Sequence, residues 1–193
     1  MAHIAVLGLG NWGSAIARLW LLEGHKVKGW TIEQEVYESI TMEGMNHKYL
    51  PDHSLEGLEA TMHVEEALEG SEIIVLAVPS SVILNVVEDI IPHLRPGHVL
   101  LDLAKGLAPG KRLISEAIHQ MLDDNNMHNP LAVLTGPTIA PEAAGGVMTT
   151  ALVASEDVSV AENLASTLTT PTFILHPASD PVGAELWGAF KNV

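Results

Sequence analysis

Short apolar runs alternate with stretches of helical periodicity along the whole chain. Runs such as 73–78 and 131–134 are continuously apolar, which is typical of strands covered by helices on both faces. The alternation predicts an α/β fold with a doubly wound, mostly parallel sheet, in one domain over residues 1–193. The predicted strands cover 3–7, 26–30, 72–77, 98–102, 131–134, 148–153 and 172–175. The predicted helices cover 11–23, 33–41, 63–69, 80–91, 111–122, 157–168 and 179–193.

The first predicted strand leads directly into a glycine-rich turn. Gly8, Gly10 and Gly13 follow the apolar run 4–7, and a helical pattern begins at once. In a dinucleotide-binding (Rossmann-type) fold such glycines make the turn, admit the pyrophosphate and allow close helix packing. Turn glycines occur in any α/β protein, but here Glu33 also follows at the spacing of a ribose-binding acid. The context favours a nicotinamide or flavin dinucleotide site.

Composition narrows the choice of partners. The 193 residues include 24 acids, nine lysines and arginines and no cysteine, for a net charge of −15. An acidic chain lacks the basic footprint that nucleic acids and anionic membranes require. Without cysteine there is no disulfide or thiolate chemistry, and no histidine pair has metal-site spacing, so we expect no metal. No apolar run reaches the roughly 20 residues needed to cross a bilayer, and we expect a cytoplasmic protein.

Three further turns are predicted at the carboxyl ends of strands, where open α/β sheets bind ligands. Pro79 follows one strand, and a plain helix-start role is as compatible with it as a cofactor contact. Lys105 follows the next strand; an ordinary surface lysine is the alternative, but its position favours a function. Thr138 lies in a glycine-bearing turn that opens a helix, where it could hold an anionic substrate or cap the helix.

The last predicted helix carries a lysine in otherwise small and apolar surroundings. Helical spacing places Lys191 on the same face as Ala184, Trp187 and Gly188, which we expect to point inward. A lysine on a packed face is unusual unless it is paired or functional. Asn192 beside it supplies a donor and an acceptor. The sequence ends inside this helix without a stop signal, and we expect the helix to lead toward a second domain.

Six stretches together resemble the NAD(P)-dependent glycerol-3-phosphate dehydrogenases. They occur in family order along the chain, and Trp12 and the terminal Lys-Asn-Val are more specific than the glycines. The stretches are Gly8-Leu-Gly-Asn-Trp-Gly-Ser-Ala, Asn46-His-Lys-Tyr-Leu-Pro, Val78-Pro-Ser, Ala104-Lys-Gly-Leu, Leu134-Thr-Gly-Pro-Thr-Ile-Ala-Pro-Glu and Gly183-Ala-Glu-Leu-Trp-Gly-Ala-Phe-Lys-Asn-Val.

The resemblance implies further site residues. Asn11, Trp12 and Ala140 would lie at the cofactor, which is expected to be NAD, with NADP as the alternative. Lys105 would contact both cofactor and substrate.

The remaining implied residues concern a small phosphorylated substrate. Gly136, Thr138 and Asn192 would line its pocket, and Lys191 would be the general acid/base. The implied reaction is hydride transfer between NAD(P)H and dihydroxyacetone phosphate, giving sn-glycerol 3-phosphate. A lysine ammonium can donate a proton as the alkoxide develops, and Lys105 as a second cation would stabilise the negative charge.

The chain departs from the family in two respects. Thr31-Ile32-Glu33 stands where bacterial-type members often have a basic residue, so we expect NAD(H) to bind more tightly than NADP(H). The exception to this expectation would be Lys26 or Lys28, whose side chains could still reach a 2′-phosphate from the second predicted strand. We do not expect these 193 residues to include the family's helical second domain. We therefore expect this chain to bind dinucleotide without turning over substrate.

Two alternatives accompany this interpretation. The chain could belong to a related reductase that acts on another carbonyl substrate, or it could be a dinucleotide-binding module without catalysis. Apolar surface around Trp187 and Phe190 would favour self-association, and a homodimer is the partner that we consider.

Overall fold

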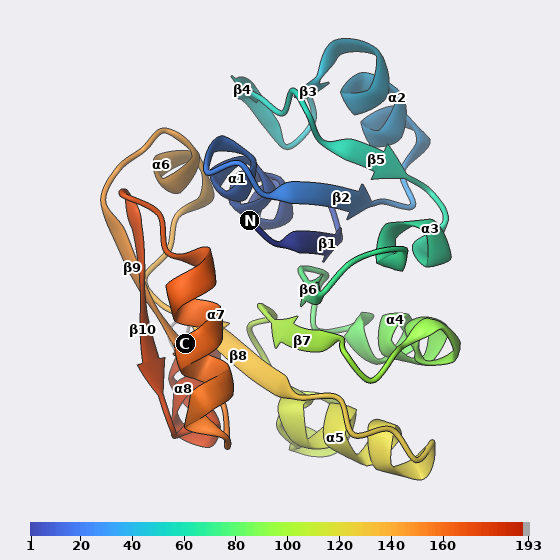
Figure 1. Cartoon of the computed structure of the whole chain (residues 1–193), viewed down its shortest axis with the longest axis vertical. Helices are drawn as coiled ribbons and strands as arrows, with labels where there is room; N and C mark the ends of the chain where they lie inside the picture. Colours follow the sequence, from blue (N-terminus) through green and yellow to red (C-terminus); the bar gives the residue numbers. More distant parts are fainter. Residues whose placement is uncertain (191–193) are drawn as a thin grey trace.

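One eight-stranded sheet with helices on both faces organises residues 1–190, the part of the chain that the computed structural model describes (Figure 1). The strands follow the order β10-β9-β8-β7-β6-β1-β2-β5. Their bounds are β1 His3–Leu7, β2 Lys26–Trp30, β5 Glu59–Thr61, β6 Ile73–Leu76, β7 Val99–Asp102, β8 Leu131–Thr135, β9 Thr149–Ala154 and β10 Phe173–Ala178. A separate antiparallel pair consists of β3 (Met45–Asn46) and β4 (Leu50–Ser54).

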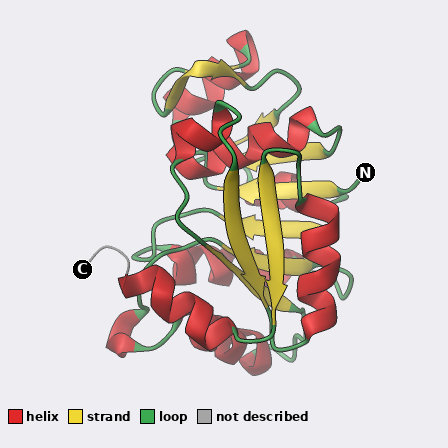
Figure 2. Cartoon of the chain, turned by 90° about the vertical axis from the view of Figure 1, so that its left-hand side faces the viewer, coloured by secondary structure: helices red, strands yellow, loops and turns green. Residues whose placement is uncertain are grey.

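The strand order places a topological switch point beside β1. From β1 the chain first builds outward to β2 and β5, then returns to β6 on the other side of β1 and continues to β7 and β8. These strands are parallel, so their carboxyl ends share one edge, while β9 pairs antiparallel to β8. The doubly wound, mostly parallel fold is thus confirmed. In Figure 2, β9 and β10 cross in front of the other strands.

The helices were predicted at nearly the right places. Their bounds are α1 Asn11–Leu22, α2 Gln34–Glu43, α3 Val64–Leu68, α4 Ile83–Ile90, α5 Ile114–Asp124, α6 Ala140–Ala144, α7 Val158–Leu168 and α8 Pro181–Phe190. Two of them, α4 and α5, start three residues later than predicted. A turn closed by the Val82 N–H on the Pro79 carbonyl precedes α4, and a 3₁₀ turn over Pro109–Lys111 precedes α5. No helix within residues 1–190 is both long and apolar enough to span a membrane.

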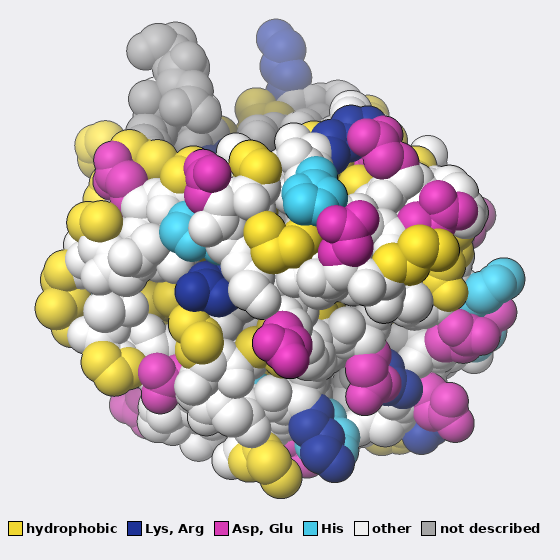
Figure 3. Space-filling model, turned by 90° about the horizontal axis from the view of Figure 1, so that it is seen from above, with side chains coloured by type: hydrophobic (Ala, Val, Ile, Leu, Met, Phe, Trp, Pro, Cys, Tyr) yellow, Lys and Arg dark blue, Asp and Glu magenta, His cyan; other side chains and the backbone are white. Residues whose placement is uncertain are grey.

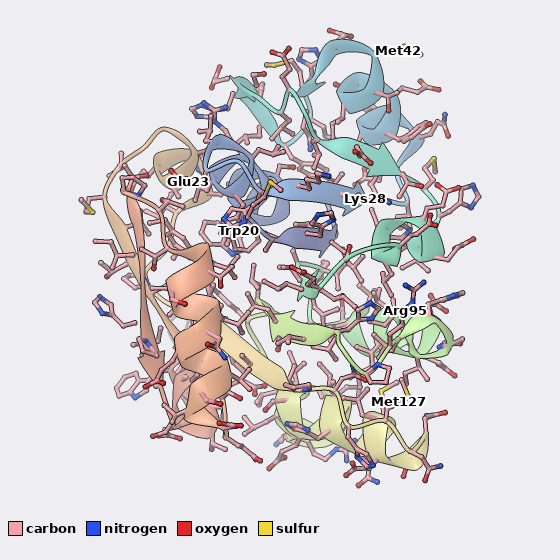
Figure 4. All side chains as sticks on the ribbon, in the orientation of Figure 1. Trp20, Glu23, Lys28, Met42, Arg95 and Met127 are labelled. Carbon is pink, nitrogen blue, oxygen red and sulfur yellow. The ribbon has the colours of Figure 1, made fainter. Side chains whose placement is uncertain are left out.

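The hydrophobic core has two halves, one on each face of the sheet. Ile4 and Val6 of β1 pack into one half with α1, α6 and α7, whereas Ala5 and Leu7 pack into the other with α4 and α5. Because successive side chains of a strand point to opposite faces, only a continuously apolar strand fits between two helical layers. Trp20 of α1 is fully buried, and its indole N–H donates to the Leu168 carbonyl at 3.1 Å, which ties α1 to α7 (Figure 4).

Candidate functional site

The glycine turn after β1 requires glycine at two of its three glycine positions, Gly8 and Gly13. Gly8 has a φ of +105°, and a Cβ there would lie 2.7 Å from the Ala77 carbonyl oxygen. A Cβ on Gly13 would collide with the carbonyl oxygen of Gly8. At Gly10 a Cβ would meet nothing within 4 Å, so open space lies above the turn. The three glycines therefore make the turn, pack helix against strand and leave room for a ligand.

Helix α1 begins at this turn with an open N-terminus. Its N-cap is Gly10, no side chain caps it, and its first turn contains no acid. The first N–H groups of the 12-residue helix therefore have no side-chain acceptor, and they point toward the open side of the turn. Such an end binds anions through these donors and through the positive end of the helix dipole.

A pocket of about 500 Å³ opens over the glycine turn. It lies at the carboxyl ends of β1, β6, β7 and β8, where the switch point predicts ligand binding. The structure brings seven of the predicted site residues to its lining: Gly10, Asn11, Trp12, Pro79, Lys105, Thr138 and Ala140. The other lining residues are Ala77, Val78, Ser80, Leu103 and Ala104.

Lys105 and Thr138 meet inside this pocket. The Lys105 ammonium donates to the Thr138 hydroxyl at 3.3 Å, although the two residues come from different turns. Thr138 does not cap α6, because the N-cap residue is Ile139 and no side chain caps that helix. The helix-cap alternative for Thr138 is therefore wrong. A cation and a hydroxyl on one wall can together hold an anionic or carbonyl oxygen.

The remaining predicted substrate residues are not in this pocket. Gly136 lines a neighbouring apolar pocket of about 450 Å³ together with Trp187 and Phe190. Lys191 and Asn192 lie outside the described residues. On α8 the predicted inward face is partly wrong: Gly188 and Ala184 are buried, but 79% of Trp187 is exposed.

Sequence reasoning missed a buried carboxyl beside Lys105. Asp102 ends β7 with its side chain fully buried; one oxygen accepts the Ala104 N–H at 2.8 Å, and the other has no hydrogen-bond partner among residues 1–190. Burial raises the pKa of Asp102 from its usual 3.8 to about 8, and the nearby charge of Glu185 acts in the same direction. An acid at the end of an otherwise apolar strand was the available signal. Asp102 fixes the start of the turn that carries Lys105.

Glu33, the predicted ribose-binding acid, lies at the carboxyl end of β2 next to the glycine turn. The two segments are joined because the Gly8 N–H donates to the Trp30 carbonyl at 2.9 Å. One carboxylate oxygen of Glu33 accepts the Lys48 ammonium at 2.6 Å and the other accepts the Tyr49 hydroxyl at 2.8 Å. The hydrogen bond from Lys48, followed by that from Tyr49, holds the pKa of Glu33 below its usual value. Glu33 is thus ionised and firmly positioned.

Charge on the face seen in Figure 3 is dispersed. Acidic side chains are scattered over the face in Figure 3, with no single basic patch to draw an anion to it. The Lys28 ammonium donates to the Glu66 and Glu69 carbonyls at the end of α3, at 3.2 and 3.1 Å (Figure 4). Within residues 1–190, no group of three His, Asp or Glu side chains could hold a metal ion. A bound anion must therefore be held by local donors.

Comparison with known proteins gives the same family from sequence and from structure. The family model described as NAD-dependent glycerol-3-phosphate dehydrogenase N-terminus matches residues 3–161. A glycerol-3-phosphate dehydrogenase [NAD(P)+] of Halothermothrix orenii is 37% identical over 192 residues, which are 99% of this chain and 55% of the relative. One from Syntrophotalea carbinolica is 36% identical over 193 residues, 99% of this chain and 58% of the relative.

A solved structure agrees with these relatives. The glycerol-3-phosphate dehydrogenase of Coxiella burnetii superposes with a TM-score of 0.89 at 32% identity, over 99% of this chain and 58% of that one. The chain thus spans little more than half the length of the relatives that it matches.

Proposed function

This chain belongs to the NAD-dependent glycerol-3-phosphate dehydrogenase family, and on that premise we propose that it is the cofactor-binding part of an NAD(P)-dependent oxidoreductase. The proposed reaction interconverts dihydroxyacetone phosphate and sn-glycerol 3-phosphate. The observation that carries the proposal is the pocket over the glycine turn, where Lys105 and Thr138 face the open end of α1. The turn offers N–H groups that can donate hydrogen bonds to an anion, and the opposite wall offers a cation.

The residues fit a dinucleotide. The backbone around Gly10 leaves open space where a pyrophosphate would lie, and the uncapped N–H groups of α1 would bind it. Glu33 stands one strand away, where its carboxylate would accept the hydroxyls of the adenosine ribose. Trp12, packed edge-on against Phe173 at 5.9 Å between ring centroids, would form an apolar wall beside the cofactor.

The chemistry assigned to this chain concerns charge and protons. NAD(P)H, when bound, supplies the hydride that reaches C2 of dihydroxyacetone phosphate. As the carbonyl oxygen gains negative charge, the Lys105 ammonium would stabilise it, with the Thr138 hydroxyl orienting the ammonium. Asp102, through the Ala104 N–H, would hold the turn that positions Lys105. The Lys191 ammonium would donate the proton to the oxygen at C2, as the family resemblance implies.

Three measurements test the proposal. Titration of the protein with NADH, followed by tryptophan fluorescence, should show saturable binding, because Trp12 lines the pocket. In the whole protein that carries this sequence, dihydroxyacetone phosphate should be reduced in preference to 2-keto acids. Lys191→Ala should lower turnover by ~10²–10⁴-fold while leaving NADH affinity nearly unchanged. Absence of dinucleotide binding would refute the proposal, and a preference for 2-keto acids would refute the substrate.

A further inference from the structure

The segment 46–49 is anchored directly to the glycine turn. Asn46 is fully buried, and its amide donates to the Leu9 carbonyl at 2.8 Å and to the Ser14 hydroxyl at 2.9 Å. Its side-chain oxygen accepts the Tyr49 N–H at 3.1 Å. These bonds join α1, the turn and the β3–β4 pair. They also fix where the next residues, Lys48 and Tyr49, can reach.

Lys48 reaches Glu33, the acid assigned to the ribose. Its ammonium lies 2.6 Å from one Glu33 oxygen and 3.5 Å from Glu35. The side chains of Lys48 and Glu33 are 38% and 34% exposed, so the pair is open to solvent and to a ligand. The hydrogen bond to Glu33 raises the pKa of Lys48, which keeps the ammonium charged. A cation thus stands within contact of the acid that should discriminate between the cofactors.

We propose that Lys48 is a specificity-determining residue for the 2′ position of the dinucleotide, and this rests on the proposed function above. A carboxylate has about four acceptor sites, so Glu33 can accept a ribose 2′-OH while it is bound to Lys48 and Tyr49. A 2′-phosphate is repelled by Glu33, but it can pair with the Lys48 ammonium at the same place. Lys48 therefore weakens the discrimination against NADP(H) that Glu33 alone would impose.

The other lysines of this region are not placed for the role. Lys28 is occupied by the two carbonyls at the end of α3. Lys26 is exposed at the amino end of β2, opposite His3, at the edge of the sheet away from the glycine turn. Lys26 thus provides a control with the same change of charge, far from the ligand.

The test compares the dissociation constants of NADH and NADPH, measured by fluorescence titration, in the unaltered protein and four variants. Lys48→Met should weaken NADPH about tenfold, because it removes a charge-assisted hydrogen bond to the 2′-phosphate, which is stronger than an ordinary exposed ion pair. NADH should change less than about threefold, because the 2′-OH is bound by Glu33. Lys48→Arg should keep the ratio of the two constants. Lys26→Met should also keep it.

Each other outcome counts against the proposal. If Lys48→Met leaves the ratio unchanged, or weakens both cofactors equally, Lys48 has no part in specificity. Lys48→Gln is a second neutral variant, and circular dichroism checks that each variant is folded. If the unaltered protein binds neither cofactor, the proposed function fails, and this proposal fails with it. If it binds both and only the Lys48 effect is missing, the proposed function stands.

Discussion

Two carboxyl groups of this chain have opposite pKa shifts because their surroundings differ. Glu33 is bound by the Lys48 ammonium and the Tyr49 hydroxyl, which stabilise its ionised form. Asp102 is enclosed by the core and receives a single N–H, so its neutral form is favoured. Neither side chain lines the pocket over the glycine turn: Glu33 lies at the proposed ribose position, and Asp102 precedes the turn that carries Lys105. Glu33 therefore gives a prediction for cofactor preference, and Asp102 gives one for the pH dependence of stability.

Glu33→Gln should shift the cofactor preference toward NADP(H). We expect the unaltered protein to bind NADH more tightly than NADPH, because the Glu33 carboxylate repels a 2′-phosphate. Removing that charge also releases Lys48 toward the phosphate, so the preference for NADH should fall by about tenfold. Titration of both cofactors measures it. Glu38→Gln, an exposed change on the helix that follows Glu33, should leave the preference as it was. An unaltered preference in Glu33→Gln would remove Glu33 from the ribose site.

Asp102→Asn should change how stability depends on pH. A carboxyl whose pKa is raised in the folded state contributes its full stability below about pH 4, where it is protonated in the unfolded chain too. That contribution is lost as the pH rises toward about 8, where Asp102 ionises in the folded state. The slope is at most about 1.4 kcal/mol per pH unit. The Asn variant should lack this slope.

Denaturant unfolding measures the effect from about pH 4.5 to about pH 8.5, a range that extends from near the unfolded pKa of Asp102 to just above its folded pKa. Asp89→Asn, an exposed change on α4, is the control and should follow the unaltered protein. Burial lowers the pKa of His25 and His98, which favours stability at higher pH. Comparing each variant with its parent cancels these contributions. Equal slopes for Asp102→Asn and the parent would show that the carboxyl is not protonated in the folded state.

At the scale of elements, helices and strands with a strong hydrophobic pattern were predicted from the sequence, whereas short elements were missed. All seven predicted strands lie in the sheet. Most of them are apolar runs bounded by turn residues, whereas β2 alternates between exposed and buried positions. The strands β3, β4 and β5 were missed: β3 has two residues and β4 contains Pro51 among polar residues. These strands depend on distant contacts such as those of Asn46. The antiparallel direction of β9 was also not predictable, because an apolar run is the same in either direction.

Asn46→Ala tests whether one side chain holds three elements together. It removes two buried hydrogen bonds and one partly buried one, and it leaves the Leu9 carbonyl with the Ser14 hydroxyl as its side-chain donor. We expect the free energy of unfolding to fall by about 1–3 kcal/mol. NADH affinity should fall as well, because the glycine turn loses the hydrogen bonds that Asn46 makes to it. Asn163→Ala, an exposed change on α7, should stay within about 0.5 kcal/mol of the parent. If Asn46→Ala loses no more stability than this control, the glycine turn keeps its conformation without the Asn46 side chain.

At the scale of the whole molecule, topology explains how much of the site was predictable. The rule that ligands bind at the carboxyl ends of strands grouped Gly10, Pro79, Lys105 and Thr138 correctly from residues up to 128 apart in sequence. The bond between Glu33 and Lys48 was not predicted, because it depends on how β3 and β4 fold over the turn.

The inward face of α8 was predicted only in part, for a different reason. The helix is apolar on most sides, so periodicity does not select a face. Its one acid, Glu185, is buried and accepts the Ile114 and Ser115 N–H groups at the start of α5. A polar residue that caps another helix breaks the rule that polar side chains mark the solvent face. The exposed Trp187 is the corresponding exception among the apolar residues.

The net charge of −15 predicts that salt stabilises the molecule. Repulsion among dispersed acids opposes the compact state, and its range falls as the Debye length shortens from ~30 Å at 0.01 M salt to ~8 Å at 0.15 M. Exposed ion pairs such as Lys48 with Glu35 lose little on screening, because such pairs contribute ~0–1 kcal/mol. The melting temperature should therefore rise between these salt concentrations.

Calorimetry in NaCl measures this rise, and a charge variant separates repulsion from other effects of salt. Glu88→Gln combined with Glu162→Gln removes two exposed acids from α4 and α7. This variant should melt higher than its parent at low salt, and the difference should shrink at 0.15 M because the removed repulsion is already screened there. A melting temperature that falls with salt would show that attractive pairs outweigh repulsion despite the acidic composition. A variant advantage that persists at high salt would point to helix propensity as its cause instead.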